Sequence, residues 1–320
     1  MPHIRRVRHR LRRFHARRSA LKATAIHDRQ AAASAIDPSL RHRRREHVLM
    51  MLLMSPAVLV VFALLVVPLS WLIVQSFYAD GALSLAHYRR IFTEGIYWNT
   101  FYLTFRISVI VTLLALLMGY PIAYAASILP KRWAMLILAL VILPFWTSVL
   151  VRAYAWLILL QRSGVVNQTL MASGITDAPL PLVHNELGTI IATVHILLPF
   201  MVLPLYATMQ KIPQDLVLAG SSLGGSPLHV FMRVFFPLSL SGVLAGMTLV
   251  FVLCLGFYIT PELVGGGRTV MASMLVSRNI QLYSDWGAAS AVSVVLLICV
   301  LIIFYVVSRL VPLEKILGAK

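Results

Sequence analysis

Long apolar runs, separated by short polar segments, dominate the chain after residue 48. Six of these runs reach about 17–25 residues or more, the length that a helix needs to cross the hydrocarbon core of a bilayer. They cover roughly residues 49–77, 100–128, 133–160, 188–210, 234–257 and 286–311. Because open strands would leave backbone polar groups unpaired in lipid, each run is predicted to be helical. The pattern therefore predicts an all-α, polytopic membrane protein with six transmembrane helices.

The composition supports this fold class. Of the 320 residues, 59% are hydrophobic and 12% are charged, about half the charged fraction of soluble domains. The formal net charge is +17, but residues 1–47 hold 14 of the 28 Lys and Arg residues, so the excess is concentrated in this tail. We expect a disordered cytosolic tail over residues 1–47 that contacts anionic membrane lipid, and a six-helix domain over residues 48–320. Nucleic-acid binding by the tail is the weaker alternative, and we expect no nucleic-acid partner.

The basic residues also predict an orientation. With the amino terminus in the cytosol, the inner segments carry 21 Lys and Arg residues, the outer segments carry five, and two lie within spans. Cytoplasmic loops are enriched in Lys and Arg, so a cytosolic amino terminus is predicted. In this orientation the segment between the fourth and fifth spans faces the cytosol. Residues 215–237 of this segment read DLVLAGSSLGGSPLHVFMRVFFP.

This cytosolic segment has the pattern of a helix–turn–helix. A first short helix is predicted over residues 213–223, and the glycine pair at 224–225 ends it. Ser226 is a suitable N-cap for a second helix that begins at Pro227 and ends near residue 235. We call residues 211–236 the elbow.

The first helix of the elbow has a weak apolar face and several small residues. Leu216, Ala219 and Leu223 share one face at helical spacing, and Gly220 beside Ala219 permits another backbone to approach closely. The residues alone leave two interpretations open. The elbow either docks another protein or rests as an amphipathic segment on the lipid surface.

Signatures of soluble enzymes are absent from the sequence. There is no GxxxxGK[ST], HExxH or GxSxG motif, and Cys254 and Cys299 are too far apart in sequence to suggest a metal pair. We therefore expect no catalytic residue, no metal site and no cofactor bound by this chain. No Asp or Glu lies in the middle of a span, which argues against a proton-coupled carrier.

Polar and aromatic residues in and beside the spans are candidates for a substrate path, because intramembrane charge is costly and often functional. The candidates are Trp146, Arg152, Tyr154, Trp156, Tyr258 and Glu262. The alternative is that Arg152 extends to the lipid headgroups and the aromatics form an interfacial belt. We expect Arg106 to reach the headgroups and His195 to hydrogen-bond a neighbouring helix.

Several stretches together carry a family resemblance. The elbow resembles the cytosolic EAA loop of ABC importer permease subunits, whose pattern is Glu-Ala-Ala, three residues, a glycine and a closing proline. Ala219, Gly224 and Pro237 fall on its second residue, its glycine and its proline. The stretches LLMGYPIAYAAS, LPFWTSVLVRAYAW, ILLPFMVLPLYATM and LGFYITPELVGG are similar to stretches of spermidine/putrescine (PotB-like) permeases. The resemblance covers about residues 49–311.

The resemblance implies the fold of a type I ABC importer permease, with the elbow as the ATPase-coupling loop. The coupling residues that it implies are Asp215, Leu218, Ala219, Gly220, Leu223, Gly224, Ser226, Pro227 and Pro237. Leu218 stands where the pattern has its glutamate, and Gly220 where it has its second alanine. We therefore expect docking to depend on shape and apolar contact more than on charge.

The resemblance also implies partners. These are two ATPase subunits that hold the ATP and Mg, a second and related permease subunit, and a periplasmic solute-binding protein. The chain itself would be a multi-pass protein of the bacterial inner membrane that performs no chemistry on its cargo.

The cargo implied is a small polar solute, either a polyamine or an amino-acid-like compound. Arg152 in the path would oppose a polycation and would suit a solute with a carboxylate or phosphonate. The alternative function is a passive channel or facilitator with an interfacial elbow.

Overall fold

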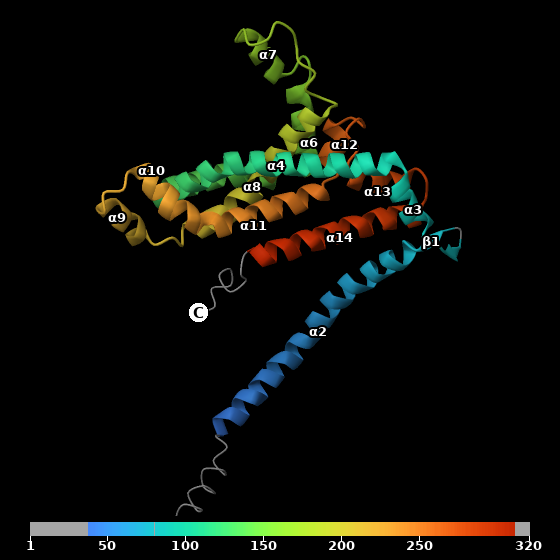
Figure 1. Ribbon diagram of the computed structural model, residues 1–320, viewed down its shortest axis with the longest axis horizontal. Helices are drawn as coiled ribbons and strands as arrows, with labels where there is room; N and C mark the ends of the chain where they lie inside the picture. The colour runs from blue at the N-terminus through green and yellow to red at the C-terminus, as the bar shows by residue number, and fades with distance from the viewer. Residues whose placement is uncertain (1–37, 80, 311–320) are drawn as a thin grey trace, which may run out of the picture. The chain divides into compact units, whose positions relative to one another are not determined.

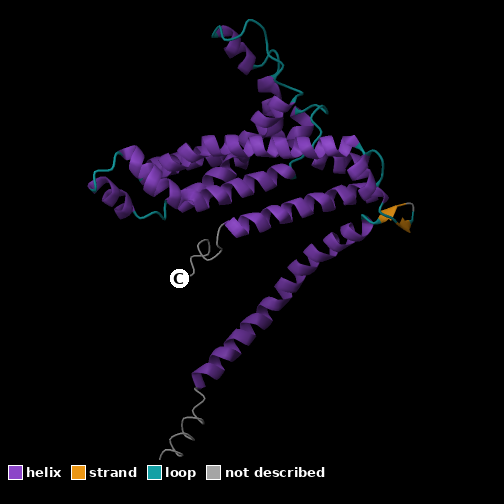
Figure 2. Ribbon diagram, viewed as in Figure 1, coloured by secondary structure: helices purple, strands orange, loops and turns teal. Residues whose placement is uncertain are grey.

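The computed structural model describes residues 38–79 and 81–310, and these are almost entirely helical (Figures 1 and 2). In chain order the elements are α2 (Pro38–Gln75), β1 (Tyr78–Ala79), β2 (Ala82–Leu83), α3 (Ala86–Thr93), α4 (Gly95–Ile128), α5 (Lys131–Ile142), the 3₁₀ turn η1 (Leu143–Trp146), α6 (Val149–Leu160), α7 (Val165–Ala172), α8 (Glu186–Met209), α9 (Gln214–Ser222), α10 (Pro227–Val230), the π-helical turn η2 (Phe231–Phe235), α11 (Phe236–Leu255), α12 (Ile259–Val264), α13 (Ala272–Gln281) and α14 (Trp286–Leu310). The two strands form a short antiparallel hairpin.

The chain divides into two units, residues 1–69 and 70–320, and α2 runs through the boundary. Residues 1–37 of the predicted tail lie outside the described residues. Helix α2 already begins at Pro38, before the expected end of the tail at residue 47. A proline suits the first turn of a helix, because the N–H it lacks would have no partner there.

Six segments of the described chain are long and apolar enough to cross a membrane. They are Leu49–Gln75, Gly95–Ile128, Val149–Ala172, Glu186–Met209, Pro227–Leu255 and Trp286–Arg309. The predicted all-α class with six spans is therefore confirmed, although the limits of the third and fifth spans differ from those predicted.

The run predicted over residues 133–160 is interrupted, so the prediction of one continuous helix there was wrong, and the third candidate span, Val149–Ala172, begins only after the break. Helix α5 ends at Ile142, η1 follows, and α6 begins at Val149 after two extended residues. Pro144 lies in this break. It has no backbone N–H to donate, and in a helix its ring would clash with the carbonyl four residues earlier. Non-helical backbone at membrane depth persists only where protein covers it or where it lines a water-filled cavity. Trp146 in the break is 88% exposed, so a cover for it would have to come from outside the described chain.

Helices α4, α8 and α11 pack against one another and form the core of the second unit (Figure 1). On α8, Met201 and Leu205 are fully buried, and they meet Val111 of α4 and Val250 of α11 in the same apolar cluster. In lipid, helices associate by close packing rather than by a hydrophobic driving force. The positions where small residues let the helices approach therefore decide how the core is held together.

Three glycines provide these close approaches around α8. A Cβ added at Gly119 of α4 would lie 2.9 Å from Cγ of Met201, and one added at Gly246 of α11 would lie 2.8 Å from its Sδ. At Gly242 of α11 the added Cβ would lie 2.7 Å from Cβ of Thr208 and 3.2 Å from the carbonyl oxygen of Pro204. A Cβ at Gly246 would also lie 3.2 Å from a backbone carbonyl, that of Met201, but the branched Thr208 side chain can move less than the flexible Met201 side chain, so Gly242 is the least replaceable of the three.

The ends of α8 identify the two faces of the core. Its 24 residues span about 36 Å, slightly more than the roughly 30 Å hydrocarbon core. The first turn is capped by Asn185 Oδ1, which accepts from the N–H of Gly188 at 2.9 Å. Here Glu186 pairs with Arg106 of α4 at 2.9 Å. Arg106 therefore has a protein partner that was not predicted, because α4 and α8 run side by side at this level.

We predict that Gly242→Ala lowers the thermal stability of the purified protein in detergent. In a helix interior, alanine is normally more favourable than glycine by about 1 kcal/mol. Here the added methyl group would overpack the contact with α8, at a cost of about 1–3 kcal/mol. Gly256→Ala is the matched control, because nothing lies within 4 Å of a Cβ at Gly256. Equal melting temperatures for the two variants would contradict the packing account.

Candidate functional site

The first helix of the elbow, α9, ends in a Schellman motif. The N–H of Gly224 donates to the carbonyl of Ser221 at 3.0 Å, and the N–H of Gly225 donates to that of Gly220 at 3.2 Å. Gly224 takes φ of +82°, the left-handed conformation that other L-residues adopt only with strain. The predicted end of this helix at the glycine pair is confirmed.

The second arm of the elbow begins as predicted but does not end as predicted. Ser226 Oγ accepts from the N–H of His229 at 3.3 Å, and Pro227 occupies the first turn of α10. Helix α10 then continues through η2 into α11, so residues Pro227–Leu255 form one helical run. The predicted separate helix ending near residue 235 was wrong. Because Pro237 lacks an N–H and its ring excludes a carbonyl one turn earlier, the backbone widens into a π-helical turn instead of breaking.

The two arms of the elbow pack through glycines. A Cβ at Gly220 would lie 3.3 Å from a methyl group of Val230, and a Cβ at Gly225 would lie 3.0 Å from the same methyl group. Val230 is buried, and Val217 on the same side of α9 packs against the main apolar cluster. Gly220, where the EAA pattern has alanine, thus permits a closer contact between the arms.

The outer side of the elbow is apolar and exposed. Leu218 is 62% exposed and Leu223 is 89% exposed. Asp215, Ala219, Ser226 and Pro237 are exposed as well. Sequence reasoning missed Leu228 and Met232, which extend this exposed side along the second arm. The signal was present as apolar side chains at a predicted aqueous surface.

A groove of about 510 Å³ separates α9 from the ends of α4 and α8. Val217 and Leu218 line it from α9, and Tyr124 and Phe231 line it from the opposite side. The groove is concave, and the exposed leucines project outward beside it. Together they form an apolar surface that the described chain does not cover.

Aromatic contacts join the base of the elbow to α4. The ring of Tyr124 lies 5.3 Å from that of Phe231 and 5.0 Å from that of Phe235, both edge-on. One turn earlier on α4, Tyr120 contacts Phe231 at 6.1 Å and its hydroxyl hydrogen-bonds Ser239 Oγ at 2.9 Å. A displacement of the elbow would therefore be transmitted to α4 as well as to α11.

Two of the predicted path residues lie one turn apart on α6. Arg152 is only 7% exposed, and its guanidinium lies 5.7 Å from the centre of the Phe145 ring in η1. Its buried Nε has no hydrogen-bond partner among the described residues. Trp156 donates from Nε1 to Nδ1 of His195 on α8 at 3.1 Å, which confirms the predicted interhelical bond of His195.

The other predicted path residues are not gathered at the same point. Trp146 is 88% exposed and Tyr154 is also exposed, so neither is covered by the described chain. Tyr258 and Glu262 lie at the junction of α11 and α12, where the N–H of Glu262 donates to the carbonyl of Tyr258 at 3.0 Å. Helix α12 packs against α6, which brings this junction near the Arg152 side of the protein. Phe145, missed in the sequence, belongs with Arg152.

Within the described residues, no group of three or more His, Cys, Asp or Glu side chains is arranged to hold a metal ion. Cys254 is buried and Cys299 is partly buried, and both are free. The geometry is that of a membrane bundle with an exposed apolar elbow at one end of its core helices.

Comparison with known proteins places the chain among transport components. Residues 40–313 match the family described as "Binding-protein-dependent transport system inner membrane component". The spermidine/putrescine transport system permease protein PotB of Haemophilus influenzae is 32% identical over 238 residues, which is 73% of this chain and 82% of that protein. PotB of Escherichia coli K12 is 33% identical over 71% of this chain and 83% of that protein. The inner membrane ABC transporter permease protein YdcU of E. coli K12 is 31% identical over 68% of this chain and 79% of that protein.

Solved structures share the fold. A bacterial ABC transporter involved in import of the acidic polysaccharide alginate superposes with a TM-score of 0.61 at 19% identity, covering 85% of this chain and 99% of that chain. The alginate transporter in complex with an alginate pentasaccharide-bound periplasmic protein gives a TM-score of 0.68 at 16% identity, covering 84% and 95%.

Proposed function

Because this chain belongs to the family of inner-membrane components of binding-protein-dependent transport systems, we propose that its elbow is the docking surface for the ATPase of the importer. The chain is a multi-pass permease subunit of an ABC importer of the PotB type. Members of this family form the membrane path, and ATP hydrolysis belongs to a separate subunit. One ATPase subunit would dock on this elbow and a second one on the elbow of a related permease partner.

The observation that supports the docking proposal best is the exposed apolar side of the elbow. Leu218 and Leu223 are 62% and 89% exposed on one short helix and its C-cap, and a group of exposed apolar side chains at a predicted aqueous surface is typical of a protein contact. An interfacial helix would instead turn its apolar side to lipid and carry Lys or Arg on its polar side. Helix α9, QDLVLAGSS, has no basic residue, and its inner side is already packed through Val217. A protein partner therefore accounts for the elbow better than a lipid surface does.

The continuity of the second arm with the fifth span suggests how docking drives transport. Residues Pro227–Leu255 form one helical run, so a push on the elbow would move α11 without an intervening loop. The aromatic contacts of Tyr124 with Phe231 and Phe235 would carry the same movement to α4. Closure of the ATPase pair would thus reach two of the three core helices directly.

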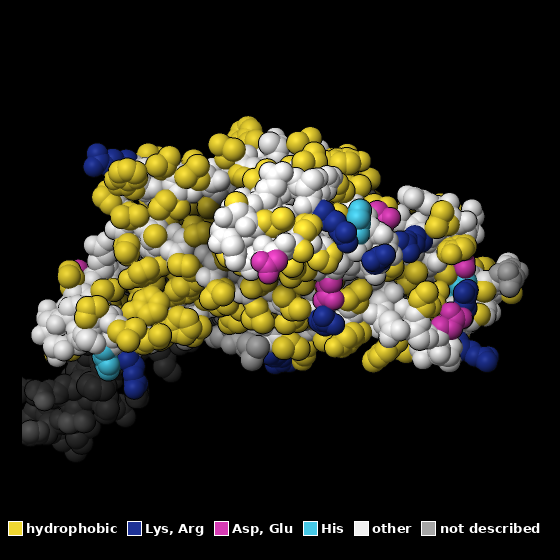
Figure 3. All heavy atoms as spheres, turned by 90° about the horizontal axis from the view of Figure 1, so that it is seen from above, with side chains coloured by type: hydrophobic (Ala, Val, Ile, Leu, Met, Phe, Trp, Pro, Cys, Tyr) yellow, Lys and Arg dark blue, Asp and Glu magenta, His cyan; other side chains and the backbone are white. Residues whose placement is uncertain are grey.

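The remaining partners are a second permease subunit and a periplasmic solute-binding protein, with the amino terminus of this chain in the cytosol. One face of the molecule is covered largely by hydrophobic side chains, with the charged side chains gathered in a few places (Figure 3). Trp146 is exposed at the break before α6, and Tyr154 is exposed after it. The second permease or the cargo would cover both side chains. The charge count and the break support this arrangement.

The cargo we propose is a small polar solute, a polyamine or an amino-acid-like compound. The names of the PotB relatives favour a polyamine. Exposed aromatic rings such as those of Trp146 and Tyr154 suit a cation, by cation–π contact. The buried guanidinium of Arg152 instead suits an anionic group. Competition of uptake by putrescine and by amino acids distinguishes the two classes.

We predict that Gly224→Ala reduces co-purification of the ATPase, and uptake with it, by about fivefold or more. An L-residue in the left-handed conformation costs roughly 1–2 kcal/mol, which shifts the equilibrium between this elbow geometry and its alternatives by about 5- to 30-fold. Gly174→Ala is the control, because Gly174 has φ of +71° and equally open surroundings in the loop after α7. Full ATPase association in the Gly224→Ala variant would refute the docking proposal, and uptake without any ATPase would favour a passive channel.

We predict that Arg152→Met lowers uptake at least about tenfold while leaving folding and ATPase association intact. Replacement of an unpaired buried charge by an apolar side chain of similar length does not destabilise a protein core, so a loss of transport would report on the path. Arg132→Met, on exposed Arg132 of α5, is the control. Unchanged uptake by the Arg152→Met transporter would show that Arg152 lies outside the path.

A further inference from the structure

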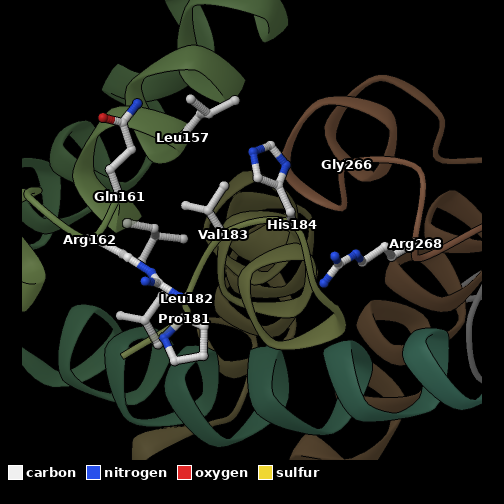
Figure 4. A pocket seen from close by; sticks show the side chains of 10 residues that line it. Leu157, Gln161, Arg162, Pro181, Leu182, Val183, His184, Gly266 and Arg268 are labelled. Atoms are coloured by element: carbon white, nitrogen blue, oxygen red, sulfur yellow. The ribbon is translucent and has the colours of Figure 1, made fainter. Parts of the chain in front are cut away.

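A basic recess lies at the end of α8 opposite the elbow (Figure 4). We propose that this recess, with Arg162, His184 and Arg268 on its rim, receives an acidic side chain of the solute-binding protein. The proposal rests on the orientation proposed above, because a cytosolic elbow places the other end of α8 outside the membrane.

Three segments that are distant in sequence form the recess. They are the end of α6 with the following turn, the loop that leads into α8, and the loop between α12 and α13. The recess has a volume of about 660 Å³. Buried Leu160 and Leu182 contribute its apolar base. Arg162 and Arg268 lie on opposite sides of it, and His184 lies between them (Figure 4).

The rim is held in place by the backbone. The N–H of His184 donates to the carbonyl of Val264 at 2.8 Å, which ties the loop before α8 to α12. His184 and Gly266 both have positive φ, and a Cβ at Gly266 would collide with the His184 ring. Glycine at position 266 is therefore needed for this contact. A rim fixed in this way is preorganised for a partner.

A second anchor holds the far side of the recess. Asn167 of α7 is fully buried, and its Nδ2 donates to the carbonyls of Gln161 and Leu180, each at 3.0 Å. Its Oδ1 accepts from the N–H of Leu180 at 2.8 Å. One side chain thus closes the long loop between α6 and α8 onto itself, next to Arg162.

The arginines of the recess have no acidic partners within the described residues, as is also true of Arg89, whereas two other arginines on the same side of the protein are paired. Arg90 pairs with Glu94 at 3.1 Å, and Arg106 pairs with Glu186 at 2.9 Å. Within the part of the chain that the structure describes, neither Arg162 nor Arg268 forms an ion pair. The recess thus has two unpaired guanidinium groups on its rim. Each of them can bind a carboxylate through two parallel hydrogen bonds, so the recess suits an acidic group.

The shape of the recess favours a protruding protein side chain over a free solute. Its charged groups are on an exposed rim and its base is apolar, so a small anion would remain largely in water. A Glu or Asp side chain on a protein surface would arrive with neighbouring residues that exclude water from the recess. The walls belong to helices of the proposed path, because α6 carries Arg152 and Trp156, and α12 carries Glu262. A partner bound here would contact the helices of the proposed path.

The test uses the complete transporter in nanodiscs and the solute-binding protein of the same transport system. We expect the double variant Arg162→Glu with Arg268→Glu to weaken binding at least about tenfold and to reduce its dependence on salt concentration. Arg89→Glu is the matched control: Arg89 is exposed on α3 and makes no ion pair within the described residues. It has the same charge change on the same side of the protein and should shift the affinity less than twofold.

Unchanged affinity in the double variant, or an equal loss in the Arg89→Glu control, would overturn the proposal. If the double Glu variant does not assemble, the pair Arg162→Gln with Arg268→Gln decides, with an expected loss of about threefold or more. A loss that disappears in nanodiscs of purely zwitterionic lipid would identify a headgroup as the occupant and would also refute the proposal. ATPase co-purification is measured on the same samples, so that failure of the elbow is distinguished from failure of the recess.

Discussion

In hydrocarbon every backbone N–H and C=O must find its partner within the protein, and this constraint decides where the chain can bend. Within the spans the requirement is met by helices, and three of them meet at glycines that fit against Met201 and Thr208 of α8. The chain leaves this pattern at few places. At the elbow, the Schellman bonds of Gly224 and Gly225 and the cap from Ser226 satisfy the backbone outside the helices. The turn can therefore be sharp and still be rigid.

A rigid elbow suits the docking function that we propose for its exposed leucines. A flexible loop would absorb the movement of a partner, whereas a capped turn whose second arm continues into α11 transmits it. The π-helical turn at Phe231–Phe235 keeps this continuity despite Pro237. It also turns Phe231 and Phe235 toward Tyr124 of α4. The same few residues thus account for the closed backbone, the link to two core helices and the uncovered outer surface.

Local sequence rules predicted the turn of the elbow correctly but did not predict the break between α5 and α6. Gly224, Ser226 and Pro227 act on the backbone within a few residues of themselves, so their local roles could be inferred without knowing the fold. Pro144 could not be distinguished in the same way. Prolines at 121, 199 and 204 remain inside α4 and α8, because neighbouring helices compensate for the lost backbone bond.

The partners in contacts between distant parts of the chain could not be identified from the sequence, although an interhelical bond of His195 was predicted. The pair of Arg106 with Glu186 joins residues that are 80 positions apart, and the bond of Trp156 to His195 joins two helices. Which side of a path residue is exposed also depends on such packing, as the burial of Arg152 and the exposure of Trp146 illustrate. The chemistry of these residues was visible in advance, but their grouping required the structure.

The central claim is that the outer side of the elbow contacts the ATPase, and photo-crosslinking tests it most directly. The photoreactive residue p-benzoylphenylalanine would be placed at Leu223, which is 89% exposed, and separately at Leu83, which is 74% exposed on the β1–β2 hairpin. On illumination of the assembled transporter in membranes, we predict a covalent adduct with the ATPase subunit from position 223 and none from position 83. Adducts from position 223 to lipid alone, with the ATPase present and active, would contradict the account.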